Sequence, residues 1–220
     1  MRNETALVVG TESPVACGQM SLSTLLDAPA VPIQEIGGYL DGLGADARLT
    51  EVRELGRGRQ RALYEKAAAA APIDLAHFVG DVPARTAVHH DGKNTLPLPG
   101  PWQRFQKRFC RPEGDAGRLF GYNHGPTEKT VGPGYFVAES TRGRPTWEAR
   151  GQVVIDYFRI PDGAVADGWP TIVTNDWRLS RFVYFETRDF MRRVSAHVSI
   201  GAAYKRERPL DHYFVLCRRA

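Results

Sequence analysis

Apolar residues in the first third of the chain recur at the spacing of amphipathic helices. Ile33, Ile36 and Leu40 illustrate the pattern, because side chains three, four and seven positions apart lie on one face of a helix. Prolines follow the first and last of these segments and end them, since proline lacks the amide hydrogen that a continuing helix needs. The pattern predicts three helices, over residues 22–26, 33–43 and 58–71.

Beyond residue 72 the apolar period changes from that of a helix to that of a strand. Val198, Ile200 and Ala202 alternate with polar or small residues, which is typical of a strand with one buried face. Turn-forming residues and a second apolar run follow, so the C-terminus is predicted to be a β-hairpin. The predicted strands are residues 119–122, 134–139, 151–159, 181–185, 196–205 and 212–217.

Two segments within this β-rich part have helical spacing instead. Trp102, Phe105 and Phe109 lie at positions i, i+3 and i+7 between two prolines. They predict a short helix over residues 101–111 with an aromatic inner face and a basic outer face. The cations of that face are Arg104, Lys107, Arg108 and Arg111. A second short helix is predicted over residues 189–194.

The order of these elements defines the expected fold class. Helices come first and strands follow, which argues against the strict alternation of a doubly wound α/β fold. We expect an α+β protein whose N-terminal helices pack on a mostly antiparallel, curved β-sheet or small β-barrel. We further expect residues 1–220 to form a single domain, with a helical part at 1–72 and a β-rich part at 73–220. A barrel of this kind holds its pocket at the mouth.

Composition narrows the cellular setting and the class of partner. The net charge is +4 and the pI is about 9.1, a mild excess that suits anionic small molecules and makes nucleic acid an unlikely partner. The three cysteines have no patterned spacing, which is typical of reduced thiols. No stretch is long and apolar enough to span a membrane. We therefore expect a cytoplasmic protein without a membrane partner. The sequence leaves open whether the protein forms a homo-oligomer.

Polar and aromatic residues that could carry chemistry concentrate between positions 74 and 135. His89, His90 and Asp91 have three interpretations: a base with its orienting carboxylate, ligands of a metal shared with His77 and His124, or the end of a strand before an Asp-Gly turn. Neighbouring residues on a strand point to opposite faces, so at most one of the two adjacent histidines joins a given site. The spacing has no metal-binding signature, and no metal is expected.

Two other residues in this region each have a structural and a functional interpretation. His124 lies beside turn-forming residues, where it is either a structural turn residue or a general acid/base and hydrogen-bonding group. Cys110 has arginines on both sides, which would lower a thiol pKa, but a buried structural cysteine is the simpler interpretation. The catalytic candidates are therefore His124, His89, His90 and Asp91.

Five strings resemble those of uncharacterised bacterial proteins. They are residues 89–94, 105–110, 121–124, 132–137 and 194–201, and the resemblance spans about residues 75–220. It implies a bacterial origin and carries no activity, cofactor or catalytic assignment.

The leading hypothesis is a binding protein that takes a small anionic or amphipathic molecule into an aromatic-lined pocket of the sheet or barrel. The expected ligand-binding residues are Trp102, Arg104, Phe105, Arg108, Tyr122, Asn123, His124, Tyr135 and Tyr157. One alternative is an enzyme that uses histidine acid/base or metal chemistry in the same pocket. Another is a nucleic-acid or protein-interaction module that uses the basic face of residues 101–111. The sequence pattern does not indicate which cofactor, if any, the protein uses, and it does not decide whether the protein is an enzyme.

Overall fold

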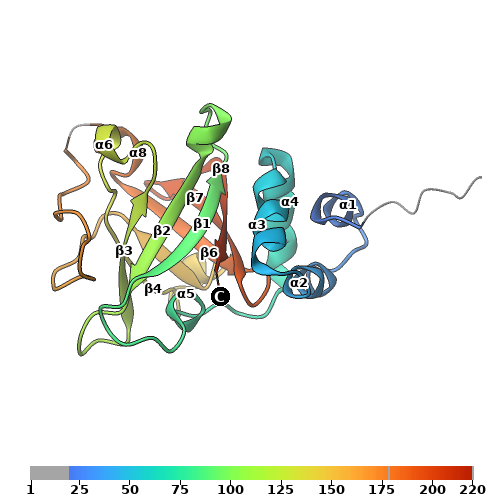
Figure 1. The fold of residues 1–220 in the computed structure, drawn as a ribbon, viewed down its shortest axis with the longest axis horizontal. Helices are drawn as coiled ribbons and strands as arrows, with labels where there is room; N and C mark the ends of the chain where they lie inside the picture. The colour runs from blue at the N-terminus through green and yellow to red at the C-terminus, as the bar shows by residue number, and fades with distance from the viewer. Residues whose placement is uncertain (1–19, 178, 220) are drawn as a thin grey trace, which may run out of the picture.

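The computed structural model describes residues 20–177 and 179–219, and within them eight antiparallel strands form a closed barrel (Figure 1). Each strand pairs with the next along the chain, and β1 pairs with β8 to complete the circle. The strands are β1 (Val88–Asn94), β2 (Arg104–Cys110), β3 (Arg118–His124), β4 (Phe136–Ser140), β5 (Val153–Asp156), β6 (Thr187–Arg193), β7 (Val198–Lys205) and β8 (Arg208–Arg218). The α+β class is confirmed, and of the two expected architectures the barrel is the one observed.

Large apolar side chains fill part of the barrel interior. Phe109, Phe136 and Leu216 belong to one buried cluster of inward-facing residues. Glycine is required where these rings approach the opposite backbone: a Cβ at Gly121 would lie 2.3 Å from the Phe136 ring. Small and large residues therefore alternate across the interior so that the aromatic rings fit.

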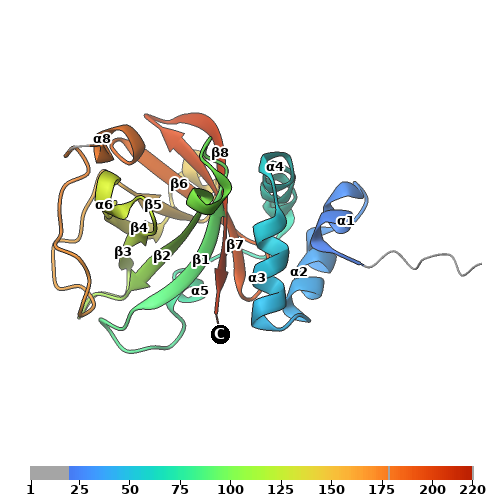
Figure 2. The same ribbon diagram turned by 45° about the horizontal axis from the view of Figure 1, so that its top comes forward.

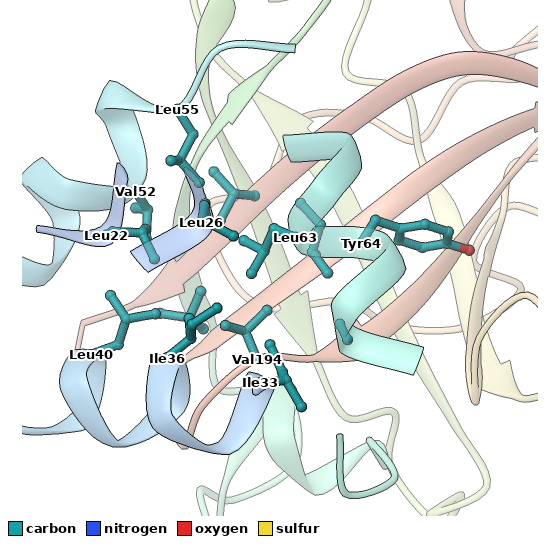
Figure 3. Packing of buried hydrophobic residues seen from close by; sticks show 14 of the residues in the cluster. Leu22, Leu26, Ile33, Ile36, Leu40, Val52, Leu55, Leu63, Tyr64 and Val194 are labelled. Atoms are coloured by element: carbon teal, nitrogen blue, oxygen red, sulfur yellow. The ribbon is translucent and has the colours of Figure 1, made fainter. Parts of the chain in front are cut away.

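The N-terminal helices form a layer beside β7 and β8, outside the barrel (Figure 2). They are α1 (Leu22–Asp27), α2 (Ile33–Asp41), α3 (Ala45–Glu54) and α4 (Arg57–Lys66), followed by the short 3-10 helix η1 (Ala67–Ala69). Figure 3 shows Leu22, Ile36 and Leu63 meeting in the cluster that the helices share with the outward side chains of the sheet. The sequence pattern did not predict α3, whose only buried residues are Arg48, Leu49 and Val52.

The two ends of the barrel differ. Helix α5 (Ala76–Val79) covers one end, where the ring centre of Phe78 lies 4.8 Å from that of Phe109. The loop that follows β4 carries α7 (Pro145–Glu148) at the same end. The 3-10 helix η2 (Gly100–Gln103), α6 (Glu128–Val131) and α8 (Ser180–Val183) lie around the other end (Figure 2). We call these the closed end and the mouth.

Three predicted elements are wrong in type. Residues 101–111 form η2 and strand β2 rather than a helix, because Phe105 and Phe109 are four positions apart and so share a face in a strand as well as in a helix. Residues 189–194 belong largely to strand β6, where Asp189 and Met191 face inward. The predicted strand at 181–185 is instead α8 and its end.

The Asp-Gly turn, one of the three interpretations of the paired histidines, is not formed. Strand β1 continues through Gly92 to Asn94 and pairs with β2 on one side and β8 on the other. A Cβ at Gly92 would lie 2.9 Å from side-chain atoms of Leu216 and Phe105. This glycine therefore makes room for neighbouring interior side chains and does not form a turn.

Candidate functional site

A cavity of about 490 Å³ opens at the mouth and reaches into the barrel. Its volume is in the range of roughly 300–1,000 Å³ that is typical of small-molecule sites. The wall is mostly apolar and includes Leu96, Leu98, Phe105, Val131, Tyr184 and Phe214. The floor is polar and consists of Lys107, Asn123, Tyr157 and Asp189, which we call the floor cluster.

The floor cluster is held by hydrogen bonds among its own members. Lys107 Nζ donates to Asn123 Oδ1 at 2.9 Å and to Asp189 Oδ2 at 3.2 Å, and it also donates to the Tyr157 hydroxyl. Asn123 Nδ2 donates to the Tyr157 hydroxyl and to the Gly134 carbonyl, each at 3.0 Å. Every N–H of the ammonium therefore has an acceptor, as a buried charge requires.

Strand register brings these four residues together from separate parts of the chain. Lys107 on β2 is directly opposite Asn123 on β3, and both side chains point inward. Asp189 enters from β6, and Tyr157 follows the last residue of β5. Lys107 is 2% exposed and Asp189 5%, so their charges are separated from bulk water.

Aromatic rings surround the Lys107 ammonium. Nζ lies 4.6 Å from the ring centre of Phe214, 5.0 Å from that of Tyr157 and 5.1 Å from that of Phe136. The faces of such rings attract a cation and partly replace its lost hydration. The ammonium is thus stabilised by one carboxylate and by several π faces at once.

Burial shifts both members of the ion pair toward their neutral forms. Loss of hydration lowers the pKa of Lys107, and the nearby Asp189 opposes this change. The same loss raises the pKa of Asp189, against the effect of Lys107. Burial also raises the pKa of Tyr157 well above its ordinary value, so its hydroxyl keeps its proton. The pair carries no net charge whether or not the proton moves between its members.

Exposed apolar side chains surround the mouth. Trp102, Leu179 and Val183 line the cavity entrance, and Trp102 is 50% exposed there. Phe182 on α8, in the same helix as Val183, is 75% exposed. His124 also lines the entrance, where its Nδ1 lies 2.6 Å from Glu128 Oε2. An apolar ligand would therefore pass an apolar rim before reaching the cavity.

The structure places only some of the expected binding residues in this cavity. Trp102, Phe105, Asn123, His124 and Tyr157 line it. The remaining four lie outside the cavity lining, and they are Arg104, Arg108, Tyr122 and Tyr135. Tyr122 and Tyr135 pack with Trp169 on the outer surface of the barrel.

The arginines lie outside because inward and outward positions alternate along β2. Arg108 Nη1 donates to the Tyr122 hydroxyl at 2.9 Å on that outer side, and Arg104 is exposed. The cations of residues 104–111 therefore do not share one basic face, since Lys107 points into the barrel. No observation favours a nucleic-acid surface on this segment.

His90 lies on the opposite side of β1 from His89 and Asp91. His90 points inward at the closed end, with Nε2 2.8 Å from the Phe78 carbonyl oxygen. Asp91 points outward and pairs with Arg53 of α3 at 3.1 Å and with Arg219, which follows β8, at 2.7 Å. His89 is on that same outer side of β1 and is exposed. A base oriented by Asp91 is therefore not formed by His90.

The candidate metal ligands and the cysteines do not form a reactive group at the cavity within the described residues. Among residues 20–177 and 179–219, no group of three or more histidine, cysteine, aspartate or glutamate side chains is placed to hold a metal ion. Cys110 is fully buried outside the cavity lining, and burial raises its pKa to about 11. Cys217 is buried in the same way, and Cys17 lies outside the described residues.

Sequence reasoning missed Lys107 and Asp189 as site residues because both were assigned to helices. The sequence pattern could have identified Lys107 if residues 104–110 had been interpreted as a strand. Lys107 lies two positions from Phe105 and two from Phe109, so in a strand it shares their inward face. A charged residue in the middle of such a face has to be paired when the strand is buried.

Comparison of the chain with protein-family models, with curated proteins and with solved structures gave no match. Within the part of the chain that the structure describes, no helix has the length and apolar character needed to cross a bilayer. The fold and the site define the class: an antiparallel eight-stranded barrel with helices outside it and a cavity that opens at one end.

Proposed function

We propose that the protein binds a small amphipathic molecule in the barrel, with its apolar part along the wall and one polar group at the floor cluster. The observation that supports this most strongly is the cavity itself, which has apolar walls, an apolar rim and one polar cluster at its base. Each methylene group transferred from water to such a wall contributes about 0.8 kcal/mol. The wall therefore supplies affinity, and the floor cluster selects and orients the polar end.

The charge balance of the floor cluster favours an uncharged polar group on the ligand. Lys107 and Asp189 already compensate each other at 3.2 Å. A carboxylate placed beside them would bring a further charge out of water without a free partner, which is costly. A hydroxyl or carbonyl group can exchange hydrogen bonds with the cluster at no such cost. Of the anionic and amphipathic ligands considered, we favour the neutral amphipathic one.

Titration with decanol and with decanoate tests this proposal. We expect decanol to bind more tightly than decanoate, because only the second brings an uncompensated charge to the floor. Tryptophan fluorescence, to which Trp102 at the mouth contributes, reports binding, and the thermal shift of the protein reports it independently. Equal or tighter binding of decanoate would contradict the neutral-ligand choice, and binding of neither would contradict the function.

A cavity-filling variant locates the binding. Ala203 lines the cavity, so Ala203→Phe is expected to abolish the response to decanol by occupying its space. Arg104→Ala is the matched control, since Arg104 is exposed and lies outside the cavity lining. If Ala203→Phe binds decanol as the unmodified protein does, the ligand lies elsewhere.

A second candidate function is catalysis at the floor cluster. Three titratable side chains converge there within hydrogen-bonding distance: Lys107, Asp189 and Tyr157. Convergence of acid and base groups in a cleft is a general mark of an active site. These groups are a lysine, an aspartate and a tyrosine, and His89, His90 and Asp91 do not take part.

A further inference from the structure

One lysine of the chain faces the cavity, and the other four do not. All five lysines lie within the described residues, and only Lys107 belongs to the cavity lining. Lys66 Nζ donates to backbone carbonyls of residues 29 and 31, and Lys93 Nζ to that of Arg53. Lys129 is exposed on α6, and Lys205 lies at the end of β7. Among the lysines, all of which are described, a ligand inside the barrel therefore meets the amine of Lys107 alone.

The floor cluster can hold this amine in its uncharged form. The proton donated by Nζ toward Asp189 Oδ2 at 3.2 Å can pass to that oxygen, and burial acts on both groups in this direction. The hydrogen bonds persist after the transfer: the neutral amine donates to Asn123 and Tyr157 and accepts from the protonated carboxyl. A nucleophilic amine thus exists without an unpaired charge in the barrel.

We propose that Lys107 forms a reversible imine with the aldehyde or ketone group of an apolar ligand. This inference rests on the proposed function, and it makes the ligand class an amphipathic carbonyl compound. The polar group that the floor cluster takes is then the carbonyl, which is uncharged as the charge balance requires.

The step conserves atoms and charge with the groups present. The Nζ lone pair attacks the carbonyl carbon, an N–C bond forms, and the carbonyl oxygen takes the proton that Asp189 had received. Asp189 then takes one proton from the nitrogen and returns it to the hydroxyl group, which leaves as water while the C=N bond forms. The product is a protonated imine beside an ionised Asp189, so the ion pair of the resting site is restored with the ligand attached.

The surroundings of Nζ favour this product. Ring centres of Phe214, Tyr157 and Phe136 lie between 4.6 and 5.1 Å from it, and they attract a protonated imine as they attract the ammonium. The apolar wall limits the water that would hydrolyse the imine. The Tyr157 hydroxyl, which contacts Nζ, is a second hydrogen-bond donor to the carbonyl oxygen.

Reductive trapping tests the proposal on the intact protein. The chain is incubated with decanal and cyanoborohydride at neutral pH, cut with a protease that does not cleave at lysine, and mapped by mass spectrometry. We expect a decyl group to be added to Lys107 about tenfold or more faster than to any other lysine, because each unit by which a pKa falls raises the free-amine fraction up to tenfold. Labelling that follows surface exposure, with Lys107 no faster than Lys129, would overturn the proposal.

Variants and a parallel ligand separate this outcome from failure of the binding function. Lys107→Arg is expected to remove the fast adduct, while Lys129→Arg keeps it. Decanol, which has no carbonyl group, is titrated in parallel. Decanol binding without a Lys107 adduct overturns the imine alone, and absence of both overturns the proposed function as well.

Discussion

Buried polar side chains give the two ends of the barrel different properties. At the mouth end, Lys107 and Asp189 lie 3.2 Å apart and both line the cavity. At the closed end, His77 and His90 are buried with ring centres 6.4 Å apart, and neither ring nitrogen of His77 has a hydrogen-bond partner among the described residues. Burial lowers the pKa of His77 to about 2 and that of His90 to about 4.

The closed end predicts a loss of stability in acid. Both imidazoles stay neutral in the folded chain, with Arg193, Arg218 and His197 adding to the cost of protonating His77. The unfolded chain binds these protons below the ordinary pKa of 6.5, so stability falls as the pH drops from 6.5 toward 4. Each imidazole contributes about 1.4 kcal/mol per pH unit there.

Replacement of one imidazole checks this prediction. In His77→Phe, which keeps a ring but does not titrate, the free energy of unfolding should fall less steeply over the same pH range. Chemical denaturation at a series of pH values measures both slopes. Identical slopes for the variant and the unmodified protein would show that His77 does not titrate on unfolding.

At the scale of elements, helix α2 shows how a local pattern and a tertiary contact act on adjacent residues. Gly37 and Gly38 both lie within the helix, where glycine costs about 1 kcal/mol relative to alanine. A Cβ at Gly37 would lie 2.7 Å from the Val194 carbonyl oxygen, whereas nothing lies within 4 Å of a Cβ at Gly38. Close packing of the helix on the barrel therefore depends on the first glycine only.

The two glycines predict opposite effects of the same substitution. Gly38→Ala should stabilise the protein by about 0.5–1 kcal/mol, because it lowers the entropy of the unfolded chain. Gly37→Ala should destabilise it by about 1–3 kcal/mol, because the methyl group forces the helix away from the backbone of Val194. Urea denaturation of both variants measures the difference. A similar sign for both would mean that α2 does not pack at this distance.

Elements with a strong local period were predicted well, and those near the site were not. Helix α2 and the hairpin of β7 and β8 follow directly from the apolar spacing. Strand β2 was taken for a helix because the spacing of Phe105 and Phe109 satisfies both periods. That error put Lys107 on a solvent face, whereas Asn123 and Tyr157 were correctly placed on or beside strands. The missing information was tertiary, because only the pairing of β1, β2 and β3 decides between the two periods.

At the scale of the whole molecule, one apolar cluster joins the helical layer to the barrel. Leu40 and Leu63 from the helices and Ile200 and Val215 from the sheet belong to it, and all are fully buried. The four tryptophans lie in the β-rich part, whereas the longest helices lie in the N-terminal part. Different spectroscopic signals therefore report on the two parts.

The shared cluster predicts that helices and barrel unfold together. Leu40→Ala should lower the free energy of unfolding by about 2–5 kcal/mol, through lost burial and the cavity it leaves. Far-ultraviolet circular dichroism and tryptophan fluorescence should shift to the same new midpoint. Loss of the helical signal before the fluorescence change would show that residues 1–72 form a separate unit, contrary to the single domain expected from the sequence.

By itself, the sequence determined the α+β class, the helical N-terminal part and the C-terminal hairpin, because apolar periods are set by neighbouring residues. Only the tertiary structure decided that β1 pairs with β8, that the sheet closes, and that a cavity remains at one end. It also decided the site, since Lys107 and Asp189 are 82 positions apart and meet only across the closed barrel. Contacts of that kind depend on the register of distant strands, which no local pattern contains.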